Sequence, residues 1–99
     1  MTLSNNYEMQ TTFVQDFAIA DKFGLDAIRE TFDRAFGEWK SNYVYLTELV
    51  ITLNLAIWHY YSNNDAYARL YNELWQIADN YALEHLKGNE LNYFLRTTD

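Results

Sequence analysis

Apolar side chains recur at intervals of three and four residues along most of this chain, which is the spacing of one face of an α-helix. The pattern predicts a short helix ending at Phe23, a second over 25–40, a third over about 43–61, a fourth over about 65–87 and a short helix after Gly88. We therefore expect an all-α fold. The expected fold is a small helical bundle in which the third and fourth helices form a long antiparallel hairpin. Two shorter N-terminal helices and one short C-terminal helix cover this hairpin.

Polar residues and glycine mark the expected helix ends. The segment 12–15 reads Thr-Phe-Val-Gln and matches a capping box, in which the glutamine reaches back to the cap amide. Gly24 is placed to end the first helix in the left-handed conformation. Ser41-Asn42 is a helix-start signal for the third helix. The pair at 63–64 is expected to make a tight connection and a cap, and Asn89 is expected to cap the last helix, because an asparagine side chain accepts hydrogen bonds from the first free amides.

Each predicted helix has an apolar face that we expect to point into the core. On the fourth helix that face ends in His85, which we interpret as a packed or hydrogen-bonded imidazole at the edge of the core. The expected core positions are Phe13, Phe17, Ala20, Leu25, Ile28, Phe32, Ala35, Phe36, Trp39, Leu46, Leu49, Val50, Leu53, Ile57, Tyr60, Tyr61, Tyr67, Leu70, Tyr71, Leu74, Ala78, Tyr81, His85, Leu91, Phe94 and Leu95.

The third predicted helix carries a second, narrower apolar stripe, formed by Val44, Ile51, Leu55 and Trp58. A helix that is apolar on two sides needs two packing partners. Either this helix lies in the middle of the bundle, or the second stripe meets another chain, including a second copy in a homodimer.

Eighteen of the 99 residues are aromatic, and most of them fall on the expected core faces. Each can bury roughly 150–250 Å², which helps a short chain to build a core. Trp58, Trp75 and Tyr93 lie off the main stripes and are candidates for contact with a partner.

The length of the chain predicts one helical domain over 1–99, with 1–11 irregular. The chain contains no cysteine, which excludes disulfides and thiolate chemistry and favours a reducing cytoplasm as its location. We see no export signal and no apolar run long enough to cross a membrane.

The formal net charge of −7 repels phosphate backbones and anionic membranes and favours cationic partners. We therefore expect a protein partner, with no direct contact to nucleic acid or membrane. The alternative interpretation is that the charge only keeps the protein soluble.

Candidate catalytic chemistry is sparse. The chain has three serines, two histidines and three scattered glycines, so phosphate loops, dinucleotide fingerprints and nucleophile elbows are absent from the sequence. His59 and His85 have no helical arrangement of acids that would hold a metal. We expect a non-enzymatic protein without metal or cofactor.

The segment 18–28 has the helix, glycine turn and helix order of a helix-turn-helix motif. Its second helix would need Arg, Lys, Asn or Gln near its start to contact DNA. The first outward positions are instead Asp26, Arg29, Glu30 and Asp33. DNA binding through this segment is therefore the least favoured interpretation.

Asp26, Glu30 and Asp33 share one face of the second helix, here called the acidic face, which raises the possibility of nucleic-acid mimicry. Their spacing gives about one charge per 5–6 Å of helix axis, against about one per 1.7 Å in duplex DNA. Arg29 and Arg34 are placed to pair with Asp33 and Glu30, which would neutralise part of the face.

The core and turn residues of 19–54 and 70–99 resemble a family of small helical proteins encoded on phages and conjugative elements of gut bacteria. The resemblance covers most of the chain from Phe13 and brings no catalytic motif. It implies a mobile genetic element as the context, and such accessory proteins often block host defences by binding them.

We therefore expect an acidic protein-binding module that inhibits a host defence or other nucleic-acid-handling protein by direct contact. The alternative is a self-associating structural or regulatory protein without a defence role. The candidate partner surface consists of Asp26, Glu30, Asp33, Val44, Ile51, Leu55 and Trp58.

Overall fold

The computed structural model describes residues 12–60 and 65–99, and within these ranges the regular structure is entirely helical. The helices are α2 (Val14–Phe23), α3 (Leu25–Trp39), α4 (Tyr43–Tyr60), α5 (Asp65–His85) and α6 (Asn89–Thr98). The predicted all-α fold is confirmed.

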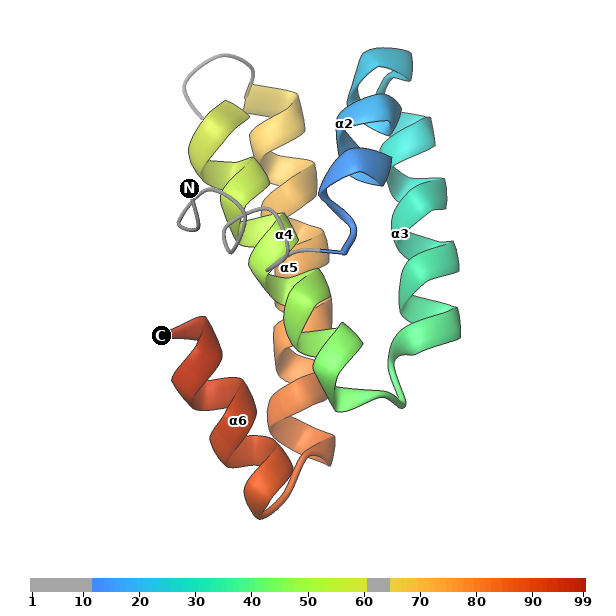
Figure 1. Cartoon of the computed structure of the whole chain (residues 1–99). Coiled ribbons are helices and arrows are strands. Elements are labelled where there is room, and N and C mark those ends of the chain that lie inside the picture. Colours follow the sequence, from blue (N-terminus) through green and yellow to red (C-terminus); the bar gives the residue numbers. More distant parts are fainter. Residues whose placement is uncertain (1–11, 61–64) are drawn as a thin grey trace, which may run out of the picture.

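The bundle is built on the antiparallel pair α4 and α5 (Figure 1). The shorter pair α2 and α3 lies along one side of it, with α3 in contact with both long helices. α6 folds back at the lower end and packs against α4 and α5. α4 therefore has α3, α5 and α6 as neighbours, which explains why its sequence is apolar on more than one side.

One apolar core runs through these helices. Its fully or nearly buried residues are Phe13, Phe17, Ala20, Ile28, Phe32, Ala35, Leu46, Leu49, Val50, Leu53, Ala56, Leu70, Tyr71, Leu74, Ala78, Ala82, Leu86 and Phe94. Most of the expected core positions are among them, because three- and four-residue spacing decides which side of a helix faces its neighbours.

Two threonines of α4 are also buried. The Thr47 hydroxyl donates to the Tyr43 carbonyl at 2.7 Å, and the Thr52 hydroxyl donates to the Glu48 carbonyl at 2.8 Å. A buried hydroxyl that lacked such a partner would be costly. The central helix can therefore bury these positions even though their side chains are polar.

The start of α2 differs from the predicted capping box. Phe13 is the N-cap residue, and no side chain caps the helix. Thr12 instead turns to α4, where its backbone N–H donates to Glu48 Oε1 at 2.9 Å and its hydroxyl donates to the same oxygen. Thr12 therefore hydrogen-bonds to Glu48, which is distant in sequence, and does not cap α2 as the local pattern predicted.

A single residue, Gly24, joins α2 to α3. Its φ of +115° is in the region that favours glycine, as predicted, but its ψ of −175° makes the backbone extended and not left-handed helical. Its N–H donates to Ala20 O and its carbonyl accepts from Ile28 N, both at 3.2 Å. Gly24 therefore ends one helix and begins the next.

The other predicted caps have mixed outcomes. The helix start predicted at Ser41-Asn42 is confirmed, and Asn42 is its cap, since its Oδ1 accepts from the N–H groups of Val44 at 3.0 Å and Tyr45 at 3.3 Å. Asn89 does not cap α6, because the helix begins one residue earlier than expected and has Gly88 at its N-cap position. The pair at 63–64 lies outside the described residues.

Helix ends and three core assignments also need correction. α5 ends at His85, two residues before the predicted end, and α6 continues through Thr98, which we had placed in a tail. Leu25 is 39% exposed and Leu95 46% exposed, and His85 is exposed as well. Each lies in the first or last turn of its helix. Tyr61 and the Tyr60 side chain lie outside the part that the structure describes.

Candidate partner surface

The acidic face lies on the outside of α3. Asp26, Glu30 and Asp33 are all exposed. Among the described residues none of the three takes part in an ion pair. Their negative charge is therefore directed at solvent and available to a partner.

The predicted neutralisation of this face is wrong. Arg29 does not pair with Asp33; its Nη1 lies 3.3 Å from Glu73 Oε2 on α5. Within the described ranges Arg34 and Glu30 do not pair either. Arg29 can reach α5 because α3 packs beside it, a tertiary neighbour that helical spacing within one segment cannot reveal.

A groove of about 410 Å³ lies between α2 and α3. We call it the α2–α3 groove. It is lined by Asp16, Ile19, Ala20, Phe23, Ala27, Glu30, Thr31 and Arg34. Ala20 and Thr31 are buried and form its floor, whereas Ile19 is 49% exposed and Phe23 79% exposed. The groove shares Glu30 with the acidic face, so the two features form one continuous surface.

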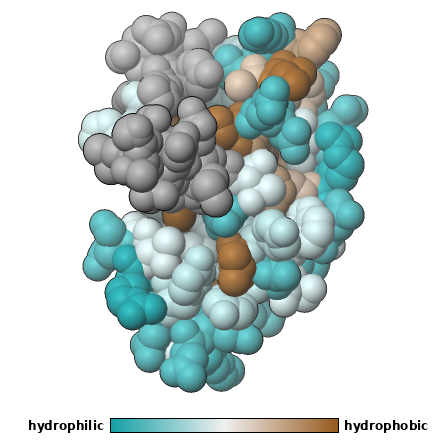
Figure 2. Space-filling view, viewed as in Figure 1, coloured by the Kyte–Doolittle hydropathy of each residue, from teal (hydrophilic) through white to brown (hydrophobic). Residues whose placement is uncertain are grey.

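The groove was not predicted from the sequence, although the sequence of α2 contains a signal of it. Ile19 and Phe23 are four residues apart and so lie on one side of α2, away from the stripe of Phe13, Phe17 and Ala20 that enters the core. As with the second stripe of α4, apolar residues on two sides of α2 indicate either two packing partners within the bundle or contact with another chain. On the face shown in Figure 2, hydrophobic atoms appear in small separate areas, one of them over α2.

The second stripe is only partly covered. Val44, Ile51 and Leu55 are half-buried, whereas Trp58 is 78% exposed. The central position of α4 accounts for much of this stripe. Trp58 is the member that stands clear of the bundle, close to the end of the helix.

The two other off-stripe aromatics are packed within the bundle. Trp75 is half-buried and contacts the core. The Tyr93 ring on α6 meets the Tyr43 ring of α4 edge-on, with 5.3 Å between the centroids. Of the three aromatics proposed for partner contact, Trp58 is thus the one largely exposed.

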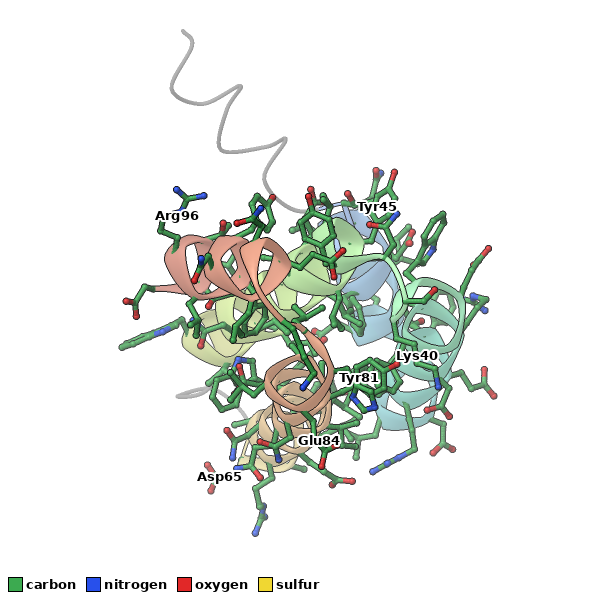
Figure 3. All side chains as sticks on the ribbon, turned by 90° about the horizontal axis from the view of Figure 1, so that it is seen from below. Lys40, Tyr45, Asp65, Tyr81, Glu84 and Arg96 are labelled. Carbon is green, nitrogen blue, oxygen red and sulfur yellow. The ribbon has the colours of Figure 1, made fainter. Side chains whose placement is uncertain are left out.

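Lys40, directly after α3, and Tyr81 on α5 lie next to each other (Figure 3). Lys40 Nζ lies 5.4 Å from the centroid of Phe36 and 5.6 Å from that of Tyr81, distances at which a cation is attracted to a ring face. His85 stacks on Tyr81 at 4.0 Å, and its Nδ1 lies 3.0 Å from the Tyr81 carbonyl oxygen. This cluster fastens the end of α3 to α5 and confirms the hydrogen bond expected for His85.

Two features of the described residues bear on metal binding and proton transfer. They contain no group of three or more His, Cys, Asp or Glu side chains that could hold a metal ion. Burial raises the pKa of the Asp79 carboxyl on α5 above its ordinary value of 3.8. The cause is the loss of solvent around the carboxyl on burial.

None of the helices in the described ranges combines the length and apolar character needed to cross a membrane. Comparisons of the chain with protein-family models, curated protein sequences and solved structures found no match. Function must therefore be inferred from the residues themselves.

Proposed function

We propose that this chain is a non-enzymatic protein-binding module of a mobile genetic element. It inhibits a host defence or other nucleic-acid-handling protein by occupying a basic surface on it. The acidic face of α3 makes the contact. The resemblance of 19–54 and 70–99 to proteins of phages and conjugative elements supplies the biological context.

The observation that carries this proposal is the unpaired state of the acidic face. Of the two bases next to it in sequence, Arg29 is held by Glu73 on α5, and Arg34 forms no ion pair among the described residues. Asp26, Glu30 and Asp33 thus present three exposed carboxylates along about 10 Å of helix. Such a surface attracts a cationic partner over several ångströms and speeds its association.

A basic groove that holds nucleic acid is a suitable target for these carboxylates. The spacing of the charges is wider than that of DNA phosphates, so the face copies only part of the electrostatic pattern. Protein contacts beside the acids must then add affinity. The apolar side chains of the α2–α3 groove lie directly next to Glu30 and can do this.

Two alternative functions are open to direct tests. The exposure of Trp58 favours self-association through the second stripe, and sedimentation at tens of micromolar would reveal a dimer. DNA binding by α3 is opposed by its three outward acids, and a gel shift at low salt tests it, since phosphate-driven affinity is strongest there.

The main test is capture of partners from a lysate of a gut bacterium by the immobilised chain. The test variant reverses the acidic face by Asp26→Lys, Glu30→Lys and Asp33→Lys. The control variant reverses three exposed acids elsewhere, by Glu38→Lys, Glu84→Lys and Asp99→Lys. Both have the same net charge, so a difference between them reports position and not total charge.

We expect a defined partner to be captured by the natural chain and by the control variant, and to be lost from the test variant. The partner should carry a basic surface that also binds nucleic acid, and added DNA should compete with the chain. Equal capture of every partner by the two variants would remove the acidic face from the proposed function.

A further inference from the structure

The α2–α3 groove combines exposed apolar side chains with fixed charges. Ile19 and Phe23 form its wall on α2, and both are large side chains left in water. Single exposed apolar residues are common on protein surfaces. Two on the same helix side, bordering one groove, form a patch of the kind that marks an interaction site.

The shape of the groove fits a helix. α2 and α3 run in opposite directions around Gly24 (Figure 1). The groove is lined by side chains of both helices. Its floor residues, Ala20 and Thr31, are small, which allows another backbone to approach closely. From Asp16 to Phe23 it spans about two helical turns. A third helix laid in this groove would complete a three-helix arrangement with the short pair.

The charges of the groove select a basic occupant. Asp16 lies on one wall and Glu30 on the other, with Arg34 as the base that lines the groove with them. Asp26 and Asp33 extend the negative charge along α3. A helix with lysine or arginine beside its apolar stripe complements these groups.

A second copy of this chain is a poor occupant. In a symmetric dimer the same patch appears on both subunits, so Asp16 and Glu30 of one copy would approach the acids of the other. Like charges brought together at an interface disfavour a complex. The net charge of −7 adds repulsion between copies.

We propose that the α2–α3 groove binds an amphipathic basic helix of a partner protein. Apolar residues of that helix, spaced at three and four, pack on Ile19 and Phe23, and its lysines or arginines face Asp16 and Glu30. This inference rests on the proposed function as a protein-binding module and adds to it the secondary structure and chemistry of the segment that is bound.

The test uses a synthetic, fluorescein-labelled peptide of leucine and lysine, about 14 residues or four turns long, with leucine at helical spacing. Its binding to the full chain is followed by fluorescence anisotropy. Two control peptides are used. One has the same composition with leucine at every second position, and the other keeps the helical pattern with glutamate in place of lysine.

Variants of the chain locate the binding. Ile19→Ser with Phe23→Ser removes the apolar wall, whereas Ile77→Ser with Leu83→Ser removes two exposed apolar side chains of α5, away from the groove. The exposed fractions are 49% and 79% in the first pair and 42% and 49% in the second. All four side chains are exposed, so both double variants should fold, which circular dichroism checks.

We expect the helical leucine–lysine peptide to bind the natural chain and the control variant alike. Binding to the groove variant should be at least about tenfold weaker, the size of effect typical of central apolar anchors. Binding should also weaken as salt is raised. Neither control peptide should bind comparably.

Several results would overturn the inference. These are no binding of the helical peptide at 100 μM, equal loss of binding in both double variants, equal binding of the glutamate peptide, or a dimer in sedimentation that only the groove variant disrupts. The proposed function fails separately, since lysate capture that depends on the acidic face can persist when the peptide does not bind.

Discussion

The hairpin of α4 and α5 and the shorter pair of α2 and α3 use their apolar residues differently. In the hairpin, Leu46, Leu49 and Leu53 are 0% exposed, and Leu74 is 1% exposed. In the short pair, Phe17 and Ile28 are as deeply buried, yet Ile19, Phe23 and Leu25 are substantially exposed. Most of the large apolar side chains of the long helices are buried in the core or pack against it.

The difference follows from the number of neighbours. α4 packs against three other helices, so apolar residues on several of its sides are covered. α2 packs chiefly against α3, and only the side with Phe17 and Ala20 enters the core. Apolar residues on its other side, such as Ile19 and Phe23, remain exposed and are available for binding. Exposed apolar residues of the hairpin, such as Ile77 and Leu83, do not border the groove.

The largest expected contrast comes from truncating one apolar side chain in each region. Leu53→Ala should lower the free energy of unfolding by about 2–5 kcal/mol, because it leaves a cavity in the core. Phe23→Ala should change it by less than about 0.5 kcal/mol, since the ring is in solvent. Urea unfolding measures both. A comparable loss for Phe23→Ala would show that its ring supports the fold.

The junction of the short pair gives the next effect. At Gly24 the φ of +115° and ψ of −175° lie in a region almost restricted to glycine, so Gly24→Ala should cost about 1–3 kcal/mol through backbone strain alone. A Cβ there would meet no atom within 4 Å, so no clash contributes. Thermal unfolding monitored by circular dichroism measures the loss.

Gly37→Ala is the matched control for that strain. Gly37 lies inside α3, and a Cβ there also meets nothing within 4 Å. Alanine is the better helix former, so this variant should gain about 0.5–1 kcal/mol. If both substitutions changed the free energy of unfolding in the same direction, the loss at position 24 could not be attributed to backbone strain.

A hydrogen bond ties the short pair to the hairpin. The buried Tyr71 of α5 donates its hydroxyl to Asp21 Oδ1 of α2 at 3.0 Å. Tyr71→Phe should cost about 1–2 kcal/mol, because the acceptor is a carboxylate and Asp21 is partly buried. Asp21→Asn keeps an acceptor oxygen and should cost less. Urea unfolding of both variants compares them, and equal losses would contradict a role for the acceptor.

Much of this fold could be predicted from the sequence. The order of the helices, the hairpin and most core positions follow from apolar spacing, which is a local property of each segment. Gly24 and Asn42 were placed correctly at helix ends because their backbone and side-chain preferences are also local. The conformation of Gly24 and the partner of Thr12 were not, since both depend on how helices meet.

The candidate surface was less predictable for the same reason. The positions of Asp26, Glu30 and Asp33 on one exposed side of α3 follow from their spacing. The diversion of Arg29 to Glu73 depends on a residue of another helix, 44 positions away. A groove likewise needs two helices placed side by side before it exists. Neither the Arg29–Glu73 pair nor the groove can be predicted from the residue pattern within a single helix.

The smallest expected effect concerns Asp79, the acid of the hairpin whose pKa is raised by burial. Because the folded pKa lies above the ordinary value of 3.8, the folded state holds this proton more tightly than the unfolded chain does. Stability from this group is therefore lost as pH rises through the folded pKa, and at neutral pH the buried charge is a cost.

Asp79→Asn removes that cost, so it should raise the free energy of unfolding at pH 7, and the gain should disappear below about pH 3.8, where the carboxyl is protonated in both states. Asp33→Asn, at an exposed site on α3, should change stability by less than about 0.5 kcal/mol at either pH. Urea unfolding at pH 7 and at pH 3 compares the two. A loss of stability at pH 7 in Asp79→Asn would mean that the hairpin holds this carboxylate by a favourable contact. Burial in the hairpin would then not set Asp79 apart, as a destabilising acid, from the exposed acids of the short pair.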